Sequence, residues 1–167
     1  QQRLDAALQL LQDGRRDEAR EALLALTRDY PQYSGPFTDL GILYARNRQR
    51  DEAIVAFRKA VTLNARNTVA WNWLGTLYRE AGQFSAADHA YRSAIAARPQ
   101  DPAAHLNLAI LYDVSLHRPD VALQAYRDYQ RVAGGEAKPI VSVWIKELEL
   151  RGIDRGLAMV EQRPVQP

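Results

Sequence analysis

The side chains that could do chemistry in this sequence are few, and their spacing does not bring them together. The three histidines, His89, His105 and His117, have no spacing that would place two of them on one metal ion. The chain has no cysteine, which removes thiolate nucleophiles and sulfur-ligated zinc sites. The sequence contains no Gly-x-Ser-x-Gly motif and no glycine-rich phosphate loop. We therefore expect a protein that is not an enzyme and that binds no metal or other cofactor.

The charged residues also favour structural roles. The pairs Asp17-Glu18 and Asp51-Glu52 recur one repeat period apart at predicted helix starts, where negative charge complements the helix dipole. Arg46, Arg48 and Arg50 cluster around one predicted turn, either as an anion site or, as we favour, as a solvated turn. Because 22 Lys and Arg face 20 Asp and Glu, a net charge of +2, we expect no nucleic-acid partner. No window approaches 18 consecutive apolar residues, so we expect no direct membrane insertion.

The sequence repeats with a period of 34 residues. Three columns show the repeat. A column of ring-bearing residues consists of Phe37, Trp71 and His105, a column of leucines of Leu40, Leu74 and Leu108, and a column of small residues of Gly41, Gly75 and Ala109. Apolar residues within a repeat recur at i, i+3, i+4 and i+7, and Gly14 and Gly82 mark turns, which together predict an all-α solenoid of stacked antiparallel helix hairpins. His105 is expected to pack with its column, His89 to be solvated and His117 to lie in a turn.

The third repeat carries the pattern of a known family. The motifs are Trp71-x2-Leu74-Gly75-x2-Tyr78, then Ala87-x3-Tyr91-x2-Ala94, then Pro99. This arrangement resembles the tetratricopeptide repeat (TPR) in both motif and period. The resemblance implies four hairpins within residues 1–136, at about 1–33, 34–67, 68–101 and 102–136, stacked as a right-handed superhelix.

The sequence departs from that family's pattern at three places. The first repeat lacks the aromatic column between Leu4 and Leu11, and Arg48 replaces a turn glycine. The fourth repeat has one extra residue between Tyr112 and Ala122. We interpret this extra residue as a longer turn, Asp113 to Arg118, before the second helix of that hairpin.

The period stops after Gly134-Gly135, and a different helix is predicted to follow. Its apolar residues share one stripe: Ile140, Val141, Trp144, Ile145 and Leu148. A solenoid needs a terminal helix with one polar face, so we expect residues 137–151 to cap the fourth hairpin. Residues 152–167 are expected to form a C-terminal tail that lies against another surface, either of the same molecule or of a neighbouring one.

In proteins that this chain resembles, the first helix of each hairpin lines a concave face that holds ligand peptides. Carried over by position, that face consists of Thr38, Ile42, Ala45 and Arg46, then Asn72, Trp73, Thr76, Arg79 and Glu80, then Leu106, Asn107, Ile110 and Asp113, with Leu4, Leu8 and Leu11 extending it. Its mixture of apolar and charged residues fits a peptide better than a small polar metabolite. Trp73 is either the centre of partner binding or a packing residue between hairpins. The lysines and the arginine with which chaperone adaptors of the family grip a terminal carboxylate are missing, so we expect no such clamp.

The resemblance implies a protein–protein interaction module: an adaptor, scaffold or assembly factor that binds a peptide segment of a protein partner. One alternative is a self-association domain in which Trp144, the capping helix and the tail pair with a second copy. Another is an accessory domain of a larger protein. The Ala-, Leu- and Arg-rich composition resembles bacterial members of the family, several of them periplasmic or attached to the outer membrane. A bacterial periplasmic or outer-membrane-associated location is therefore implied, with the cytoplasm as alternative.

Overall fold

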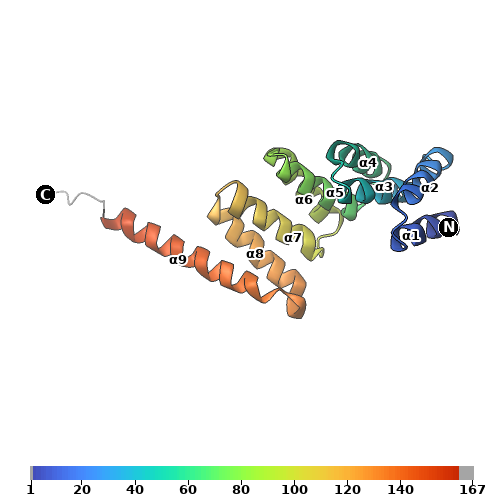
Figure 1. Ribbon diagram of the computed structural model, residues 1–167. Helices are drawn as coiled ribbons and strands as arrows, with labels where there is room; N and C mark the ends of the chain where they lie inside the picture. The colour runs from blue at the N-terminus through green and yellow to red at the C-terminus, as the bar shows by residue number, and fades with distance from the viewer. Residues whose placement is uncertain (1, 162–167) are drawn as a thin grey trace. The chain divides into compact units, whose positions relative to one another are not determined.

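The computed structural model describes residues 2–161, with side chains described through residue 152. The chain divides into two compact units, Gln1–Pro99 and Gln100–Pro167, which are described separately. The N-terminal unit contains α1 (Gln2–Gln12), α2 (Arg16–Asp29), α3 (Ser34–Arg46), α4 (Arg50–Leu63), α5 (Thr68–Glu80) and α6 (Phe84–Ala97) (Figure 1). The C-terminal unit contains α7 (Pro102–Ile110), η1 (Leu111–Ser115), α8 (Pro119–Ala133), η2 (Gly134–Glu136) and α9 (Pro139–Glu161). Every regular element of the described range is helical, which confirms the all-α prediction.

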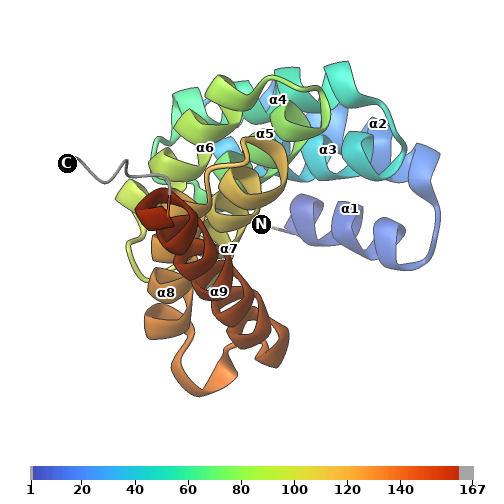
Figure 2. The same cartoon turned by 90° about the vertical axis from the view of Figure 1, so that its left-hand side faces the viewer.

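Consecutive helices of the N-terminal unit pair as hairpins, α1 with α2, α3 with α4 and α5 with α6, and neighbouring hairpins stack (Figure 2). The first core joins the first two hairpins through Ala7, Leu23, Leu26, Leu40 and Leu43. The second core joins the second and third hairpins through Ala53, Phe57, Ala60, Val61, Ala70, Leu74, Leu77 and Ala90. Because each core is shared, a hairpin buries its apolar face only by stacking on its neighbour, as predicted for a solenoid.

Two glycines let the helices of a hairpin approach closely. A Cβ atom built on Gly41 of α3 would lie 2.7 Å from Cε1 of Phe57 in α4. A Cβ atom on Gly75 of α5 would lie 2.5 Å from Cδ1 of Tyr91 in α6. Both rings have no exposed surface. The small column and the aromatic column of the repeat are therefore complementary surfaces within each hairpin.

The four hairpin turns share one unusual backbone position. Gly14, Arg48 and Gly82 have φ values of 77°, 60° and 73°, and His117 has a φ of 51°. This left-handed region is free of steric cost only for glycine. Arg48 therefore occupies a glycine site, as predicted, and His117 occupies the same site in the fourth hairpin.

The extra residue of the fourth repeat lies in the π-helical segment η1, which continues directly from α7. In the third repeat, the N–H of Gln83 donates to the carbonyl of Tyr78, five residues earlier. In the fourth repeat, the N–H of Arg118 donates to the carbonyl of Tyr112, six residues earlier. The interpretation of a longer turn from Asp113 to Arg118 is therefore wrong, because a wider helical coil accommodates the insertion and the turn keeps its form.

Helix α9 covers the last hairpin of the C-terminal unit. Val141, Ile145 and Leu148 are buried against α8, and the ring of Trp144 packs 5.5 Å from that of Tyr126. Polar contacts fasten the same helix, because Arg127 bonds Glu149 at 2.6 Å and Gln130 donates to Ser142 at 2.7 Å.

The C-terminal helix is longer than the predicted cap. It continues through Glu161, beyond the expected end at residue 151, so the first part of the segment assigned to a tail is helical. Residues 162–167, which complete the predicted tail, lie outside the described residues. The side chains from residue 153 onward also lie outside the described residues, so the expectation that the tail lies against another surface stays a prediction.

Candidate functional site

The predicted partner-binding residues of the N-terminal unit lie on α3 and α5, which pack against each other. Residues at i, i+3 and i+7 share one face of a helix. We call the resulting surface the α3/α5 face, and it consists of Asp39, Ile42 and Arg46 on α3 and Trp73, Thr76 and Glu80 on α5. Arg46 and Glu80 are exposed, and the other members are partly buried. The face thus combines apolar Ile42 and Trp73 with the Asp39 carboxyl and with charged residues at the C-terminal ends of both helices.

Thr38 does not belong to this exposed surface. Its side chain is buried, and its hydroxyl donates to the Ser34 carbonyl at 2.9 Å. The same hydroxyl accepts a 2.7 Å hydrogen bond from the Asn67 amide, whose oxygen caps α5 through the N–H of Ala70. Thr38 therefore links the second hairpin to the third. The prediction that it lines the groove is corrected by its burial.

Trp73 has a structural contact on one side of its ring. The indole stacks on Phe57 of α4, with centroids 5.9 Å apart and planes inclined by 9°. It also packs against the second core, as Ile42 does. Part of the Trp73 side chain stays accessible, so it fills space between hairpins and still contributes to the α3/α5 face.

The polar neighbours of Trp73 on α5 are held by local bonds. The Thr76 hydroxyl donates to the Asn72 carbonyl at 3.1 Å and lies 3.2 Å from the Tyr91 hydroxyl. Asn72 and Arg79 are partly buried. These contacts leave the face on α5 pre-ordered around the indole.

Asp39 is a candidate that the sequence analysis missed. Burial raises the pKa of its carboxyl to about 6, and no described residue forms a salt bridge or hydrogen bond with the carboxylate. The repeat contained the signal, because Asp39 lies 34 residues before Trp73 and 68 before Asn107, both of which were selected. Burial without a neighbouring cation disfavours the charged form of this carboxyl, which is the cause of its raised pKa.

The predicted residues of the C-terminal unit serve its core more than its surface. Leu106 and Ile110 pack against the core shared by α7, α8 and α9. Asp113 lies in η1 and accepts a 3.1 Å hydrogen bond from the Tyr126 hydroxyl. Burial and the Asp113 carboxylate raise the pKa of that hydroxyl. Asn107 is partly buried.

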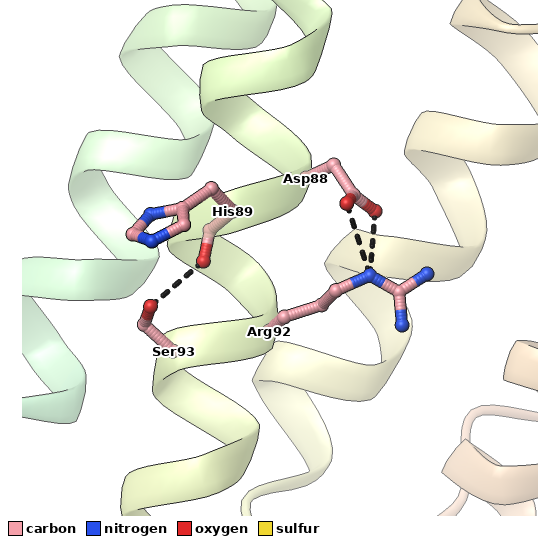
Figure 3. Close-up of polar contacts among 4 residues, drawn as sticks. All are labelled: Asp88, His89, Arg92 and Ser93. Atoms are coloured by element: carbon pink, nitrogen blue, oxygen red, sulfur yellow. Dashed lines mark hydrogen bonds and ion pairs between the residues drawn. The ribbon is translucent and has the colours of Figure 1, made fainter.

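The three histidines have different surroundings in the structure. His105 is buried within α7, which confirms its packing role, whereas the exposed His89 places its ring 5.8 Å from that of Trp71, edge to face. Figure 3 shows the surroundings of His89 on α6. Its carbonyl accepts from Ser93 at 2.8 Å, and the Nε of Arg92 reaches both Asp88 carboxylate oxygens, at 3.0 and 2.9 Å. Among the residues with described side chains, no group of three metal-ligating residues comes together.

Two of the turn arginines, Arg48 and Arg50, border a pocket of about 750 Å³ with mixed charge. Its charged lining residues are Arg48, Arg50, Asp51, Glu52 and Glu80. Because acids outnumber bases there, the pocket has no net attraction for an anion, and the solvated-turn interpretation fits it better. Within the described residues, no helix is both long and apolar enough to cross a membrane.

Models of the tetratricopeptide repeat match residues 3–33 and 44–106, together more than half of the chain. The chain is a tetratricopeptide repeat protein. Proteins of this fold are in general protein–protein interaction modules.

Solved structures of other TPR proteins have the same fold. A crystal structure of MamA shares 23% identity and a TM-score of 0.79, covering 95% of this chain and 86% of that one. MamA from Desulfovibrio magneticus RS-1 is 19% identical with a TM-score of 0.76, and the match covers 93% of this chain and 86% of that one. PilF of Pseudomonas aeruginosa is 18% identical with a TM-score of 0.76, and the match covers 91% of this chain and 68% of that one.

Curated relatives match part of the chain and a small part of their own length. Protein bimA of Emericella nidulans is 29% identical over 85 residues, 51% of this chain and 10% of bimA. The UDP-N-acetylglucosamine–peptide N-acetylglucosaminyltransferase of Giardia intestinalis is 32% identical over 78 residues, 47% of this chain and 5% of the transferase. The chain therefore spans a tenth or less of these relatives.

Proposed function

We propose that this TPR protein is an adaptor that binds a peptide segment of a partner on the α3/α5 face. The observation that carries the proposal is the partly buried Asp39 carboxylate, which stands without a cation on the same helix face as Ile42. A charge in that position is costly unless a ligand compensates it. The partner segment therefore combines a Lys or Arg side chain, directed at Asp39, with an apolar residue directed at Ile42 and Trp73.

The exposed ends of the face set the orientation of the bound segment. Arg46 and Glu80 carry opposite charges at the C-terminal ends of α3 and α5. A peptide with a residue of either charge can pair with one of them, but only the basic residue at Asp39 reaches a desolvated position. Because an ordered surface must still immobilise a flexible peptide, the expected dissociation constant is about micromolar.

A library of random peptides displayed on phage tests this proposal. Selection on the wild-type chain should enrich peptides with a basic residue close to an apolar one. Binding of an enriched peptide should fall about tenfold or more in Asp39→Asn and Ile42→Asp, since both remove a central contact. It should also tighten as the pH rises from about 5 to 7, because the carboxyl with a pKa of about 6 then becomes charged.

Arg58→Glu provides a matched control on the outer helix α4. Arg58 is exposed, and no ion pair joins it to the residues with described side chains. It is a cleaner control than Arg92, because Arg92 is paired with Asp88 and its reversal would place two acids together. If Arg58→Glu abolishes binding while Ile42→Asp leaves it unchanged, the partner uses the outer helices and the proposal is wrong.

Self-association is the second candidate function, and one feature of α9 favours it. Ile140, Val143 and Leu150 are 47%, 57% and 55% exposed on the side of α9 that does not pack on α8. They share that side with the Glu147–Arg151 salt bridge, and exposed apolar side chains of this kind can pack on a helix of a second copy. Sedimentation at two concentrations distinguishes the candidates, because only self-association requires the mass to rise with concentration.

The small share of the relatives that the chain spans also supports the accessory-domain hypothesis, for which the full reading frame is the test.

A further inference from the structure

Two pockets of the N-terminal unit are equivalent under the 34-residue repeat. The first, of about 570 Å³, is lined by residues of α2, α3 and α4, and the second, of about 410 Å³, by residues of α4, α5 and α6. Phe37 in the wall of the first corresponds to Trp71 in the wall of the second, and Tyr44 corresponds to Tyr78. We call the second one the Trp71 pocket. Because the repeat gives both pockets the same scaffold, their lining residues can be compared position by position.

Charge differs at three of the positions that line both pockets. In the Trp71 pocket, Leu24 is replaced by Arg58, Val55 by His89 and Glu52 by Ala86. Each change adds a basic group or removes an acid. Of the described residues that line the Trp71 pocket none is acidic, whereas in the first pocket Asp51 and Glu52 outnumber the single base Lys59. The repeat therefore keeps the position of the pocket and reverses its charge.

The basic groups of the Trp71 pocket are open to a ligand. Arg58 and His89 are both exposed, and no ion pair joins Arg58 to the residues with described side chains. The acid next to His89 in the sequence, Asp88, is engaged by Arg92, with 2.9 Å between Nε and Oδ2. Figure 3 shows the ring of His89 pointing away from this ion pair. The pocket therefore attracts an anionic group.

The apolar wall of the pocket is ordered without a ligand. The indole N–H of Trp71 donates to the carbonyl of Ala65 at 2.9 Å, and the ring of His89 stands edge to face with the indole, with centroids 5.8 Å apart. Leu74 is buried and Tyr78 is partly buried in the same wall. A wall that is already fixed lowers the ordering cost of binding. The pocket thus joins a fixed apolar surface to a positive charge that its own lining does not compensate.

We infer that the Trp71 pocket docks a partner segment in which an acidic residue stands next to an aliphatic or aromatic one. The carboxylate accepts from the guanidinium of Arg58, whose planar N–H groups match two carboxylate oxygens, and from the imidazole of His89. The apolar neighbour lies against Trp71 and Tyr78. None of these residues belongs to the α3/α5 face, for which we propose a ligand of the opposite charge, so the inference does not depend on that function.

Fluorescence anisotropy of a labelled peptide with the full chain tests the inference. The probe is Gly-Ser-Glu-Leu-Glu-Phe-Gly-Ser, and the control peptide has Gln in place of both Glu residues. We expect saturable binding of the acidic peptide and at least about fivefold weaker binding of the control, which keeps the apolar contacts and loses the ion pair. Arg58→Gln should remove most of this preference, because it removes the guanidinium charge. Glutamine is a good helix former at this exposed position, so the fold should persist, which a thermal melt checks.

Lys59→Gln is the matched control variant. Lys59 is the next residue of α4, is also exposed and lines the first pocket, so its substitution removes the same charge from the chain and leaves the Trp71 pocket intact. The preference for the acidic peptide should stay unchanged in this variant, as it should in Asp39→Asn. His89→Val installs the residue of the first pocket and should weaken binding of the acidic peptide independently of Arg58.

Three results would overturn the inference. The first is that the acidic peptide does not bind saturably, or binds no better than the control peptide. The second is an equal loss of preference in Arg58→Gln and Lys59→Gln, because the net charge of the chain would then account for binding. The third is displacement of the peptide by inorganic phosphate more effectively than by sodium chloride at the same ionic strength, because the pocket would then take a free anion.

Discussion

Replacing Gly75 with alanine tests how the two columns of the repeat fit together. The substitution adds one methyl group in the middle of α5, where alanine is a better helix former than glycine by about 1 kcal/mol. The new Cβ would, however, lie 2.5 Å from Cδ1 of Tyr91, about 1 Å inside an ordinary contact. The ring is fully buried and its hydroxyl lies 3.2 Å from that of Thr76, so it has little room to turn away. Overpacking costs about 1–3 kcal/mol and more where neighbours cannot relax.

The two effects oppose each other, and the steric effect is the larger. We expect Gly75→Ala to lower the free energy of unfolding by about 1–2 kcal/mol and Gly75→Leu to lower it further. Denaturant unfolding followed by tryptophan fluorescence measures the change, because Trp71 and Trp73 lie in the same helix. Gly41→Ala should act in the same direction.

Gly35 provides the matched control for this prediction. It lies in the first turn of α3, and nothing is within 4 Å of a Cβ built on it. Gly35→Ala should therefore be neutral or stabilise the protein by up to about 0.5–1 kcal/mol. If Gly75→Ala and Gly35→Ala shift the unfolding midpoint equally, the close packing of Gly75 on Tyr91 is not what stabilises the hairpin.

Three other predictions follow from the fold and the site. Asp39→Asn should stabilise the protein by about 1 kcal/mol at pH 7 and have no effect near pH 4. The pKa of Asp39 is about 6 in the folded protein and lower in the unfolded chain, so the wild type loses stability as the pH rises through 6. The full pKa difference corresponds to at most about 3 kcal/mol, and contact with solvent reduces this value. Urea unfolding at both pH values checks the prediction. Arg48→Gly should stabilise the chain by about 1 kcal/mol or less by relieving a φ of 60°, whereas Arg48→Ala should stay within about 0.5 kcal/mol of wild type, as thermal melts of the two would show. Added zinc, nickel or nucleotide should leave the melting temperature unchanged, and a reproducible rise would contradict the expectation of a non-enzymatic protein without a cofactor.

The helices and their pairing could be predicted from the sequence because the information is periodic. A column such as Gly41 and Gly75 opposite Phe57 and Tyr91 repeats the same contact in each hairpin, so one register accounts for both. The exception at Arg48 was also visible, since glycine stands at the equivalent positions 14 and 82. The π-helical segment was not, because an insertion between two aligned residues fits a longer turn and a wider helix equally well.

The candidate site was harder to predict because a repeat column indicates the helix face on which a residue lies but not how far its side chain is buried. Thr38 belongs to the predicted set but is buried, and its hydroxyl accepts a hydrogen bond from the Asn67 side chain of the next hairpin. Trp73 is partly covered for a similar reason, by Phe57 of the preceding hairpin. Asp39 was missed because an acidic residue on a helix suggests a solvated position, and only the packing around it raises its pKa.

The π-helical segment also indicates where the fourth repeat can accommodate the insertion or deletion of one residue. Because η1 takes up the additional residue, Ala122 and Tyr126 return to their columns and are buried like their counterparts in the earlier hairpins. Val114 is 59% exposed within this segment. Deleting it would give the fourth hairpin the standard repeat length and convert the wide coil to an ordinary α-helix. We therefore expect that a one-residue change of length within η1 leaves the residues of α8 in their repeat positions.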